Sequence, residues 1–380
     1  MDDALAEVQR LAGLSGEETR NKIVNSLRNT LYSIESQDET LDRIMFLHLQ
    51  VAVVRVGINM KVFDLLHKSE QPLNLYEISR ETNTDVLLTG RLMRYLSSVG
   101  MLKETAVDTF AATNVTRALA NPGQEAGVRF FFDILGPTFQ TLPDFLIDKG
   151  YRNITDKNHT VHQDAWKTSV DAFTWLSQHP KNFSDFNRYM ATQRRTAPIW
   201  LSEYPLEAEI QGWDPKKPLF VDVGGGIGHQ CVELIIRYPK LPGRIVLQDL
   251  AHCIDEALQS PVLDVMVHNM YGPQPIKGAK YYYMRAILHV LPDERCRTVL
   301  QNIKNAMSQE SVFVIDEMVF PDSKVSWQAA QFDLTMMCAH GSMERTQTQW
   351  KALLDSVDLK IRDTYIYDSS CHQAVMAVVL

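Results

Sequence analysis

Apolar residues recur at helical spacing through the first half of the chain. From about residue 40 to residue 119, as in LDRIMFLHLQVAVVRVGINMKVFDLL, apolar side chains return every three or four positions, which is typical of amphipathic helices. The first 40 residues contain LAEVQRLAGL and IVNSLRNTLYSI, which repeat with the same period. We therefore predict a mostly helical N-terminal part, in which the first 40 residues and the helices near residues 45–63 bury apolar faces against a second subunit.

Residues 73–104 read as a short helix, a turn and a second helix, and VDTFAATNVTRAL (residues 107–119) reads as a small β-wing. This order is typical of a winged helix-turn-helix. Some modules of this kind bind DNA, but the second helix here carries only Arg91 and Arg94 among many apolar residues. We therefore expect it to serve packing and oligomerisation and not to bind nucleic acid.

The helical segments between residues 125 and 205 are rich in aromatic residues, as in VRFFFDILGPTFQTLPDFL and DAFTWLSQHP. Aromatic residues on helices belong more often to a core than to a pocket, although some of them can roof a cavity for an apolar ligand. Methionine adapts to many ligand shapes and extends this set. The candidate pocket residues are Phe132, Asp133, Phe173, Trp175, Arg188, Met190, Met336 and Met337.

The pattern changes at about residue 219, where short runs rich in β-branched residues begin to alternate with helical stretches. The runs are LFVDVG, RIVLQDL, DVMVHNM, YYYMRAIL and SVFVIDEMVF, and the helical stretches include IGHQCVELIIRYP, CIDEALQ and DERCRTVLQNIKNAM. This alternation predicts a doubly wound α/β fold with a parallel sheet covered on both faces. The last two runs, LKIRDTYIY and HQAVMAVVL, are predicted to pair as an antiparallel hairpin at the sheet edge.

Composition excludes several classes of protein. A chain of 380 residues with 45% hydrophobic and 22% charged residues is globular rather than disordered, and a net charge of −8 argues against nucleic acid or an anionic membrane as the partner. No apolar run is long enough to span a membrane, and the start MDDALAEVQR is acidic, unlike a targeting peptide. Five cysteines without a CxxC pair fit a reducing compartment and no metal site. We expect a cytoplasmic protein.

The run LFVDVGGGIGHQ combines a strand, a glycine-rich turn and the start of a helix. Its glycines, Gly224, Gly226 and Gly228, are spaced GxGxG, and Asp222 precedes them on the strand. The dinucleotide fingerprint requires a further glycine where His229 stands, and no P-loop lysine follows. The turn therefore indicates a nucleoside-containing ligand, unless it is only a tight connection between strand and helix.

Polar residues follow the next two predicted strands. Asp249 and Leu250 end RIVLQDL, about 20 residues after the glycine turn, where an acid accepts hydrogen bonds from a ribose. Asn269 and Met270 follow the third strand, where they are suited to flank an adenine. Because open α/β sheets bind ligands at the carboxyl ends of their strands, these residues are expected to share one site.

His289 ends the fourth predicted strand in YYYMRAILHVLPDE, and Pro292 follows at the start of a helix. This segment alone leaves two readings open, a catalytic base or a strand-terminal histidine bonded to backbone. Glu317, at the end of the fifth strand, and Glu344, in the loop HGSMERT, favour the base. A histidine flanked by carboxylates is held in one tautomer and becomes a stronger base.

Together these motifs resemble the plant and fungal small-molecule O-methyltransferases that use S-adenosylmethionine (SAM), especially the fungal branch of secondary metabolism. The resemblance runs from the winged helix through the GxGxG turn, QDL, PQPIKGAKYYYMRAILHVLPDE, DLTMM and GSMERT. It implies a homodimer and three parts: a winged-helix dimerisation domain (1–125), a helical substrate-pocket connector (126–205) and a Rossmann-like SAM-binding domain (206–380). It also implies S-adenosylhomocysteine as the product when the methyl group is transferred, and no metal.

The resemblance also implies roles for individual residues. His289 matches the general base, Glu317 and Glu344 match the acids beside it, and Arg285 stands where a cofactor-contacting lysine or arginine is common. Asp249 matches the acid on the ribose, and Asn269 and Met270 match the adenine site. The implied cofactor set is Asp222, Gly224, Gly226, Gly228, Asp249, Leu250, Asn269, Met270 and Arg285.

Two departures from the family pattern leave the reaction open. The family usually has Asp-Trp after the histidine, where this chain has Val290 and Leu291, and it usually has aspartate at Asn269. Some fungal members, the pericyclases of the leporin type, keep the fold and SAM but catalyse dehydration or ring-forming pericyclic steps. In that alternative, electrostatic contacts to the substrate come from Arg285, Asp133 and Arg188.

Overall fold

A computed structural model describes residues 2–196 and 199–380. The chain forms two compact units, one from Met1–Pro143 with Ala172–Ala197 and the other from Asp144–Asp171 with Pro198–Leu380. Each unit is described by itself. The three-part division at residues 125 and 205 stays a prediction.

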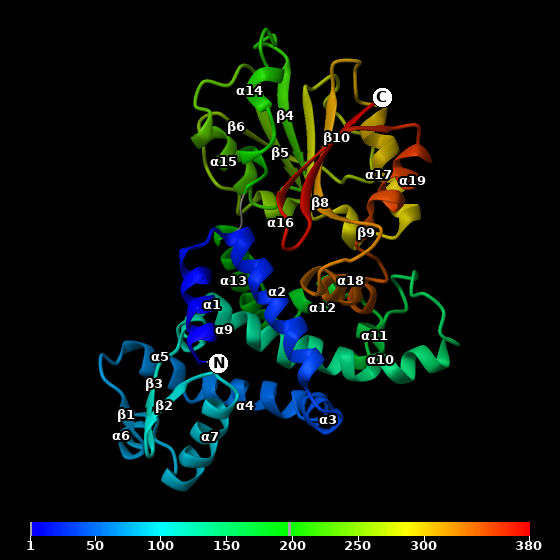
Figure 1. Cartoon of the computed structure of the whole chain (residues 1–380). Coiled ribbons are helices and arrows are strands. Elements are labelled where there is room, and N and C mark those ends of the chain that lie inside the picture. The colour runs from blue at the N-terminus through cyan, green and yellow to red at the C-terminus, as the bar shows by residue number, and fades with distance from the viewer. Residues whose placement is uncertain (1, 197–198) are drawn as a thin grey trace. The chain divides into compact units, whose positions relative to one another are not determined.

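The predicted N-terminal helices are present (Figure 1). They are α1 (Asp2–Leu14), α2 (Glu17–Ile34), α3 (Gln37–Met45), α4 (Leu47–Asn59) and α5 (Val62–Lys68). The structure describes every residue of helix α3, and none of them is buried. The helix begins at a capping box between Ser36 and Glu39. Large apolar side chains such as Leu31, Met45 and Phe46 are exposed. A run of exposed apolar faces is what a subunit interface requires.

The winged helix-turn-helix is confirmed, but its wing lies earlier than predicted. Its elements are β1 (Leu73–Asn74), α6 (Leu75–Thr82), α7 (Val86–Ser98), β2 (Lys103–Ala106) and β3 (Thr109–Ala111), and the strands form a sheet in the order β1-β3-β2. The sequence interpretation of residues 107–119 as wing was wrong for its second half. Thr113 forms a capping box with Thr116 and starts the helix α8 (Asn114–Leu119), which ends the wing.

The aromatic region of the first unit is helical, as predicted. It contains α9 (Pro122–Phe130), a π-helical turn (Phe131–Leu135), the start of α10 (Gly136–Asp148), α12 (Ala172–Ser177) and α13 (Pro180–Thr196). Helix α13 packs closely on α9 because α9 has glycines at the contact. A Cβ atom on Gly127 would lie 2.5 Å from the Tyr189 ring, so only glycine permits this approach.

The second unit is built on one mixed sheet, in the order β10-β11-β8-β7-β4-β5-β6, and β9 pairs with β8. The strands β6, β5, β4, β7 and β8 are parallel, and β11 runs antiparallel to β8 and forms a hairpin with β10. Their bounds are β4 (Pro218–Val223), β5 (Arg244–Asp249), β6 (Leu263–Val267), β7 (Tyr281–Arg285), β8 (Val312–Phe320), β9 (Arg345–Thr346), β10 (Lys360–Asp368) and β11 (Gln373–Val379). The predicted hairpin at the sheet edge is confirmed.

Successive residues of β7 show that both faces of the sheet are covered. Tyr281 and Tyr283 pack into an apolar cluster with Trp200, whereas Tyr282 packs on the other face into a cluster with Trp350. The doubly wound α/β prediction is therefore confirmed. The α-helices that lie wholly within this unit are α11 (Val161–Trp166), α14 (Leu206–Glu209), α15 (His229–Arg237), α16 (Ala251–Ile254), α17 (Asp293–Lys304), α18 (Trp327–His340) and α19 (Gln347–Asp355), several of which are labelled in Figure 1.

Two predicted element ends are wrong. Helix α16 ends at Ile254 and does not extend through CIDEALQ. Strand β7 ends at Arg285 and not at His289, because Ala286 has a φ of +52° and turns the chain away from the sheet. His289 lies instead in a 3₁₀ turn, Leu288–Val290. Among the described residues, no helix has both the length and the apolar character needed to cross a bilayer.

Candidate active site

The glycine turn between β4 and α15 brings its main chain against the end of β5. Gly224, Gly226 and Gly228 have φ values of +76°, +62° and +95°, which other residues rarely adopt. The Gly226 amide donates to Asp249 Oδ2 at 2.8 Å, and the Leu250 amide donates to Asp249 Oδ1 at 2.6 Å. The predicted neighbourhood of the glycine turn and Asp249 is therefore present.

Asp222 lies beneath this turn and is fully buried. A Cβ atom on Gly225 would come within 2.4 Å of the Asp222 carboxyl group, so the turn rests directly on that side chain. Burial raises the pKa of Asp222 to about 7, and the Cys231 thiol contacts Asp222 Oδ2 at 3.5 Å. Asp222 thus supports the turn from inside the fold.

Asn269 and Met270 follow the end of β6, as predicted. Asn269 Oδ1 accepts a hydrogen bond from the Tyr271 amide at 3.0 Å, and Asn302 Nδ2 donates to the Met270 carbonyl at 3.1 Å. Met270 is half-buried and packs against the core of the sheet. The segment is held in a defined conformation at the same edge as Asp249.

Arg285, the last residue of β7, lies close to a buried carboxylate. Its Nε atom is 3.6 Å from Asp316 Oδ2, and Asp316 also accepts hydrogen bonds from Tyr283 at 2.5 Å and Tyr367 at 2.6 Å. Burial lowers the pKa of Arg285, but Asp316 and the neighbouring Tyr283, Tyr367 and Asp222 together raise it by more, so the guanidinium remains charged. Arg285 is therefore a fixed cation at the end of the strand.

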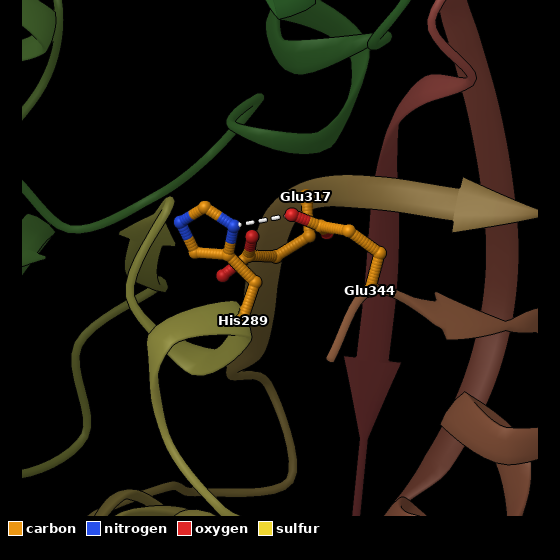
Figure 2. A group of neighbouring side chains, drawn as sticks. All are labelled: His289, Glu317 and Glu344. Carbon is orange, nitrogen blue, oxygen red and sulfur yellow. Dashed lines mark hydrogen bonds and ion pairs between the residues drawn. The ribbon is translucent and has the colours of Figure 1, made fainter. Parts of the chain in front are cut away.

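The turn that carries His289 is tied to β8. Glu317 Oε1 accepts hydrogen bonds from the amides of Ile287 at 2.9 Å and Leu288 at 2.8 Å. His289 Nδ1 and Glu344 Oε1 are 2.6 Å apart, so one ring nitrogen shares a proton with this carboxylate. Figure 2 shows the three side chains together, with the other ring nitrogen turned away from Glu344.

The charges around His289 alter its protonation. Burial lowers the pKa of His289, but Glu344 and Glu317 raise it to about 9, so the imidazole holds a second proton more tightly than an ordinary histidine. Burial raises the pKa of Glu317 to about 7. Burial and the neighbouring histidines lower the pKa of His340 to about 3, so that residue stays neutral.

Glu344 is positioned by a residue in the middle of α18. Its amide donates to Asp333 Oδ1 at 2.9 Å, and its side chain is almost fully buried. Glu344 Oε2 has no hydrogen-bond partner among the described residues. His289, Glu317 and Glu344 offer ligand atoms within 4.8 Å of one another, a set that can also hold a cation. The hydrogen bond between His289 and Glu344 suits a proton carrier, and the absence of a metal stays a prediction.

Two regions of the chain match known protein families. Residues 156–358 match the O-methyltransferase domain, and residues 43–122 match the O-methyltransferase dimerisation domain. The chain belongs to the O-methyltransferase family. The fold that the sequence resemblance implied is thereby confirmed.

Several fungal members of the O-methyltransferase family are similar along the whole chain. O-methyltransferase ucdC of Aspergillus ustus is 38% identical over 379 residues, covering 100% of this chain and 99% of the relative. O-methyltransferase lepI of Aspergillus flavus is 38% identical over 378 residues, covering 98% and 97%. Demethylsterigmatocystin 6-O-methyltransferase of Aspergillus parasiticus is 36% identical over 380 residues, covering 100% and 98%.

Solved structures of this family have the same fold. The complex of LepI with SAM has a TM-score of 0.93 and 38% identity, and it covers 100% of this chain and 98% of that chain. A structure described as a pericyclic reaction enzyme gives the same values. OxaC in complex with SAH and oxaline has a TM-score of 0.83 at 25% identity, covering 100% and 97%.

The candidate pocket residues of this O-methyltransferase family member divide between the two units. Phe132 and Asp133 lie half-buried in the π-helical turn, where Asp133 pairs with Arg55 of α4 at 2.9 Å. Among the other first-unit residues, Trp175 is buried, Met190 is half-buried, and Phe173 and Arg188 are exposed; Met336 and Met337 are half-buried on α18 in the second unit. Their joint pocket stays a prediction.

Three residues of the candidate site were missed in the sequence. Asp316 holds Arg285, Asp333 holds the Glu344 main chain, and Arg345 contacts the turn around His289. A signal existed for two of them. Asp316 stands beside Glu317 in a strand whose other residues are apolar, where a charge requires a partner, and Arg345 directly follows a predicted catalytic acid.

The pH profile of the Glu344→Gln variant tests the electrostatic role of this acid. Neutral His289 is the form that accepts a proton, and Glu344 raises the pKa of His289, so activity should rise with pH through a high pKa. Without the Glu344 charge, we expect the ascending limb of kcat/KM to move about one to three pH units lower. Glu294→Gln, an exposed acid in the first turn of α17, is the control and should leave the limb in place. An unmoved limb in Glu344→Gln would contradict this role.

Proposed function

We propose that this protein transfers the methyl group of SAM to a hydroxyl group of an aromatic or polyketide-derived small molecule of secondary metabolism. The observation that carries the proposal is the 2.6 Å contact between His289 Nδ1 and Glu344 Oε1. It leaves Nε2 as the ring atom that can take a proton from an acceptor hydroxyl. Membership of the O-methyltransferase family supports the reaction class.

The residues at the strand ends fit a nucleoside-containing cofactor. A Cβ atom on Gly226 would meet no atom within 4 Å, so the exposed side of the turn is open to a ligand. Both Asp249 oxygens accept a main-chain hydrogen bond, and each keeps a lone pair for a ribose hydroxyl. Asn269 and Met270 are proposed to flank the adenine, and Arg285 to face the cofactor as a fixed cation. When bound, SAM supplies a methyl group on a cationic sulfur and leaves as S-adenosylhomocysteine.

In the proposed mechanism, His289 Nε2 removes the proton of the acceptor hydroxyl as the oxygen attacks the methyl carbon. Glu344 keeps the other ring nitrogen protonated and stabilises the imidazolium that forms. Glu317 fixes the turn by accepting two main-chain hydrogen bonds. Positioning of the acceptor and exclusion of water supply most of the remaining rate enhancement.

A pericyclic or dehydrating reaction with SAM retained is the second candidate. It is favoured by the likeness to the pericyclic reaction enzyme and by the two residues after His289. Val290 is half-buried against the core of the sheet and Leu291 is buried within it, so neither adds a polar group beside the base. In this reaction Arg285, Asp133 and Arg188 are proposed to polarise the substrate.

A mass-spectrometric assay separates the two candidates. Purified protein is incubated with SAM and a panel of phenolic and pyridone compounds, and both products and cofactor are followed. Methyl transfer predicts a product heavier by one methylene unit together with an equal amount of S-adenosylhomocysteine. A product of unchanged or dehydrated mass that requires SAM without consuming it would overturn the methyl-transfer proposal.

We further propose that the protein is a cytoplasmic homodimer. The match to the dimerisation domain and the exposed apolar residues of α1 to α4 support the dimer, and five free cysteines fit a reducing compartment. Light scattering at micromolar concentration should give about twice the mass of one chain. A charge placed on the exposed apolar face, as in Leu31→Glu, should shift the protein toward monomer, and a wild-type monomer would contradict the dimer.

A further inference from the structure

Arg345 is a fully buried cation directly after Glu344. Its side chain is 1% exposed, and it lies on the short strand β9, which pairs with Val319 of β8. A guanidinium is removed from water only where its donors are satisfied, because an unpaired buried charge costs several kcal/mol. Its partners therefore show what this charge is used for.

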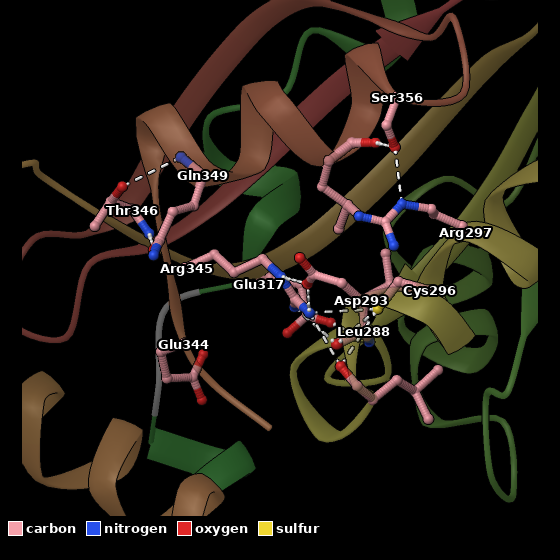
Figure 3. A network of polar contacts seen from close by, with 12 residues as sticks. Leu288, Asp293, Cys296, Arg297, Glu317, Glu344, Arg345, Thr346, Gln349 and Ser356 are labelled. Atoms are coloured by element: carbon pink, nitrogen blue, oxygen red, sulfur yellow. Dashed lines mark hydrogen bonds and ion pairs between the residues drawn. The ribbon is translucent and has the colours of Figure 1, made fainter. Parts of the chain in front are cut away.

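The guanidinium contacts both ends of the turn that carries His289. Nη1 donates to the Leu288 carbonyl at 2.9 Å, and Nη2 donates to the Leu291 carbonyl at 3.0 Å. Nη2 and Nε also donate to Asp293 Oδ1, at 2.8 and 3.1 Å, at the start of α17. Figure 3 shows these contacts converging on Arg345, whose guanidinium also lies 5.1 Å from the centre of the Trp350 ring.

Glu317 holds the same turn from its other side. Glu317 accepts a hydrogen bond from the Leu288 amide, and Arg345 donates one to the Leu288 carbonyl. Charged side chains therefore fix both the amide and the carbonyl group of the residue before His289. Arg345 follows Glu344 by one peptide bond. Two consecutive residues therefore supply the carboxylate that bonds His289 and the guanidinium group that holds the turn carrying His289.

We propose that Arg345 is a positioning residue, which holds the His289 turn in register with Glu344 so that their short hydrogen bond forms. Lysine cannot replace it, because an ammonium group lacks the planar fork that reaches two carbonyls and a carboxylate together. The proposal deepens the proposed function of this site and depends on it only for the kinetic readout.

The charge of Arg345 also acts on His289. The charged and titratable groups around His289 are Glu317 on β8, His340 on α18, and Glu344 and Arg345 beside each other. Burial lowers the pKa of His289, Glu344 and Glu317 raise it, and Arg345 lowers it. Removing the cation should therefore raise the pKa of His289, an effect that a residue with only a packing role would not produce.

Two substitutions separate geometry from charge. Arg345→Lys keeps the charge and loses the fork, whereas Arg345→Gln loses both. Arg297→Lys is the matched control, because Arg297 is exposed on α17 and, among the described residues, forms a hydrogen bond only from its Nε to Ser356 Oγ. Each variant is first compared with wild type by thermal unfolding, which shows whether it is folded, and by its affinity for SAM. The affinity for SAM should be unchanged because the glycine turn is untouched.

The decisive readouts are NMR signals of histidine-labelled protein, assigned with His289→Ala. In Arg345→Lys, we expect the downfield proton of the bond between His289 and Glu344 to shift or vanish, while the pKa of His289 stays near that of wild type. In Arg345→Gln, the pKa of His289 should rise. With an active acceptor, kcat should fall about 100-fold in Arg345→Lys with KM little changed, since small misplacements of a base have effects of this size. Arg297→Lys should match wild type in every readout.

A folded Arg345→Lys variant that keeps both the downfield proton and the wild-type kcat would overturn the proposal. An unmoved pKa of His289 in Arg345→Gln would overturn its electrostatic part. If the wild-type protein transfers no methyl group, the proposed function fails, but the NMR readouts still decide the role of Arg345.

Discussion

Replacing His289 by alanine is expected to lower kcat for methyl transfer by about 1,000-fold, the usual contribution of a general base. His289 shares a proton with Glu344 at 2.6 Å and lies in a turn held by Glu317, so its ring is fixed in the position of the proposed base. The loss should appear in kcat, with KM for SAM nearly unchanged, because the substitution leaves the proposed cofactor site at the glycine turn and Asp249 untouched. Steady-state kinetics with an acceptor found by the mass-spectrometric assay measure both constants.

His252→Ala is the matched control for this prediction. His252 is exposed on α16 in the same unit, so its removal should leave kcat within about 2-fold of wild type, as expected for a surface position. A His289→Ala variant that binds SAM and retains wild-type kcat would exclude the base role. If it instead lost a SAM-dependent product of unchanged mass, the same histidine would serve the pericyclic reaction.

The fold was predictable because its signals are local. Alternation of apolar runs and helical stretches predicted the parallel sheet. Strand β7 shows the reason: both of its faces are buried in apolar clusters, so the strand appears in the sequence as a continuous apolar run. The errors also have local causes. Ala286 adopts a positive φ without being glycine, so nothing in YYYMRAILHVLPDE marked the end of the strand four residues before His289.

The part of the candidate site that lies at the carboxyl ends of the predicted strands was predictable from the sequence. Asp249 meets the glycine turn because adjacent parallel strands end at the same edge of the sheet. His289 and Glu344 were grouped from the sequence and again by the family resemblance, but the tertiary contacts that hold their segments, from Asp333 and Arg345, were not predicted. The contact between Leu288 and Arg345 joins residues 57 positions apart, and no periodicity records it.

Replacing Asp249 by alanine is expected to weaken SAM binding by about 100-fold. The carboxylate accepts the Gly226 amide at 2.8 Å and the Leu250 amide at 2.6 Å, so its loss frees the glycine turn and removes the proposed ribose acceptor. Hydrogen bonds to a charged group contribute about 1.5–3 kcal/mol each, and losing the ribose contact accounts for most of the effect. Isothermal titration calorimetry with SAM measures the change directly, independently of any acceptor.

Asp264→Ala separates this effect from a general loss of charge on the sheet. Asp264 lies on the neighbouring strand β6 and pairs with Arg244 on the surface, away from the glycine turn, so SAM affinity should be unchanged. In kinetic assays Asp249→Ala should raise KM for SAM and leave kcat at saturating SAM nearly intact, because the turn that carries His289 is held by other residues. An Asp249→Ala variant with wild-type SAM affinity would show that the cofactor binds elsewhere on this sheet. A fall in kcat with unchanged affinity would instead place Asp249 in the chemical step and not in cofactor binding.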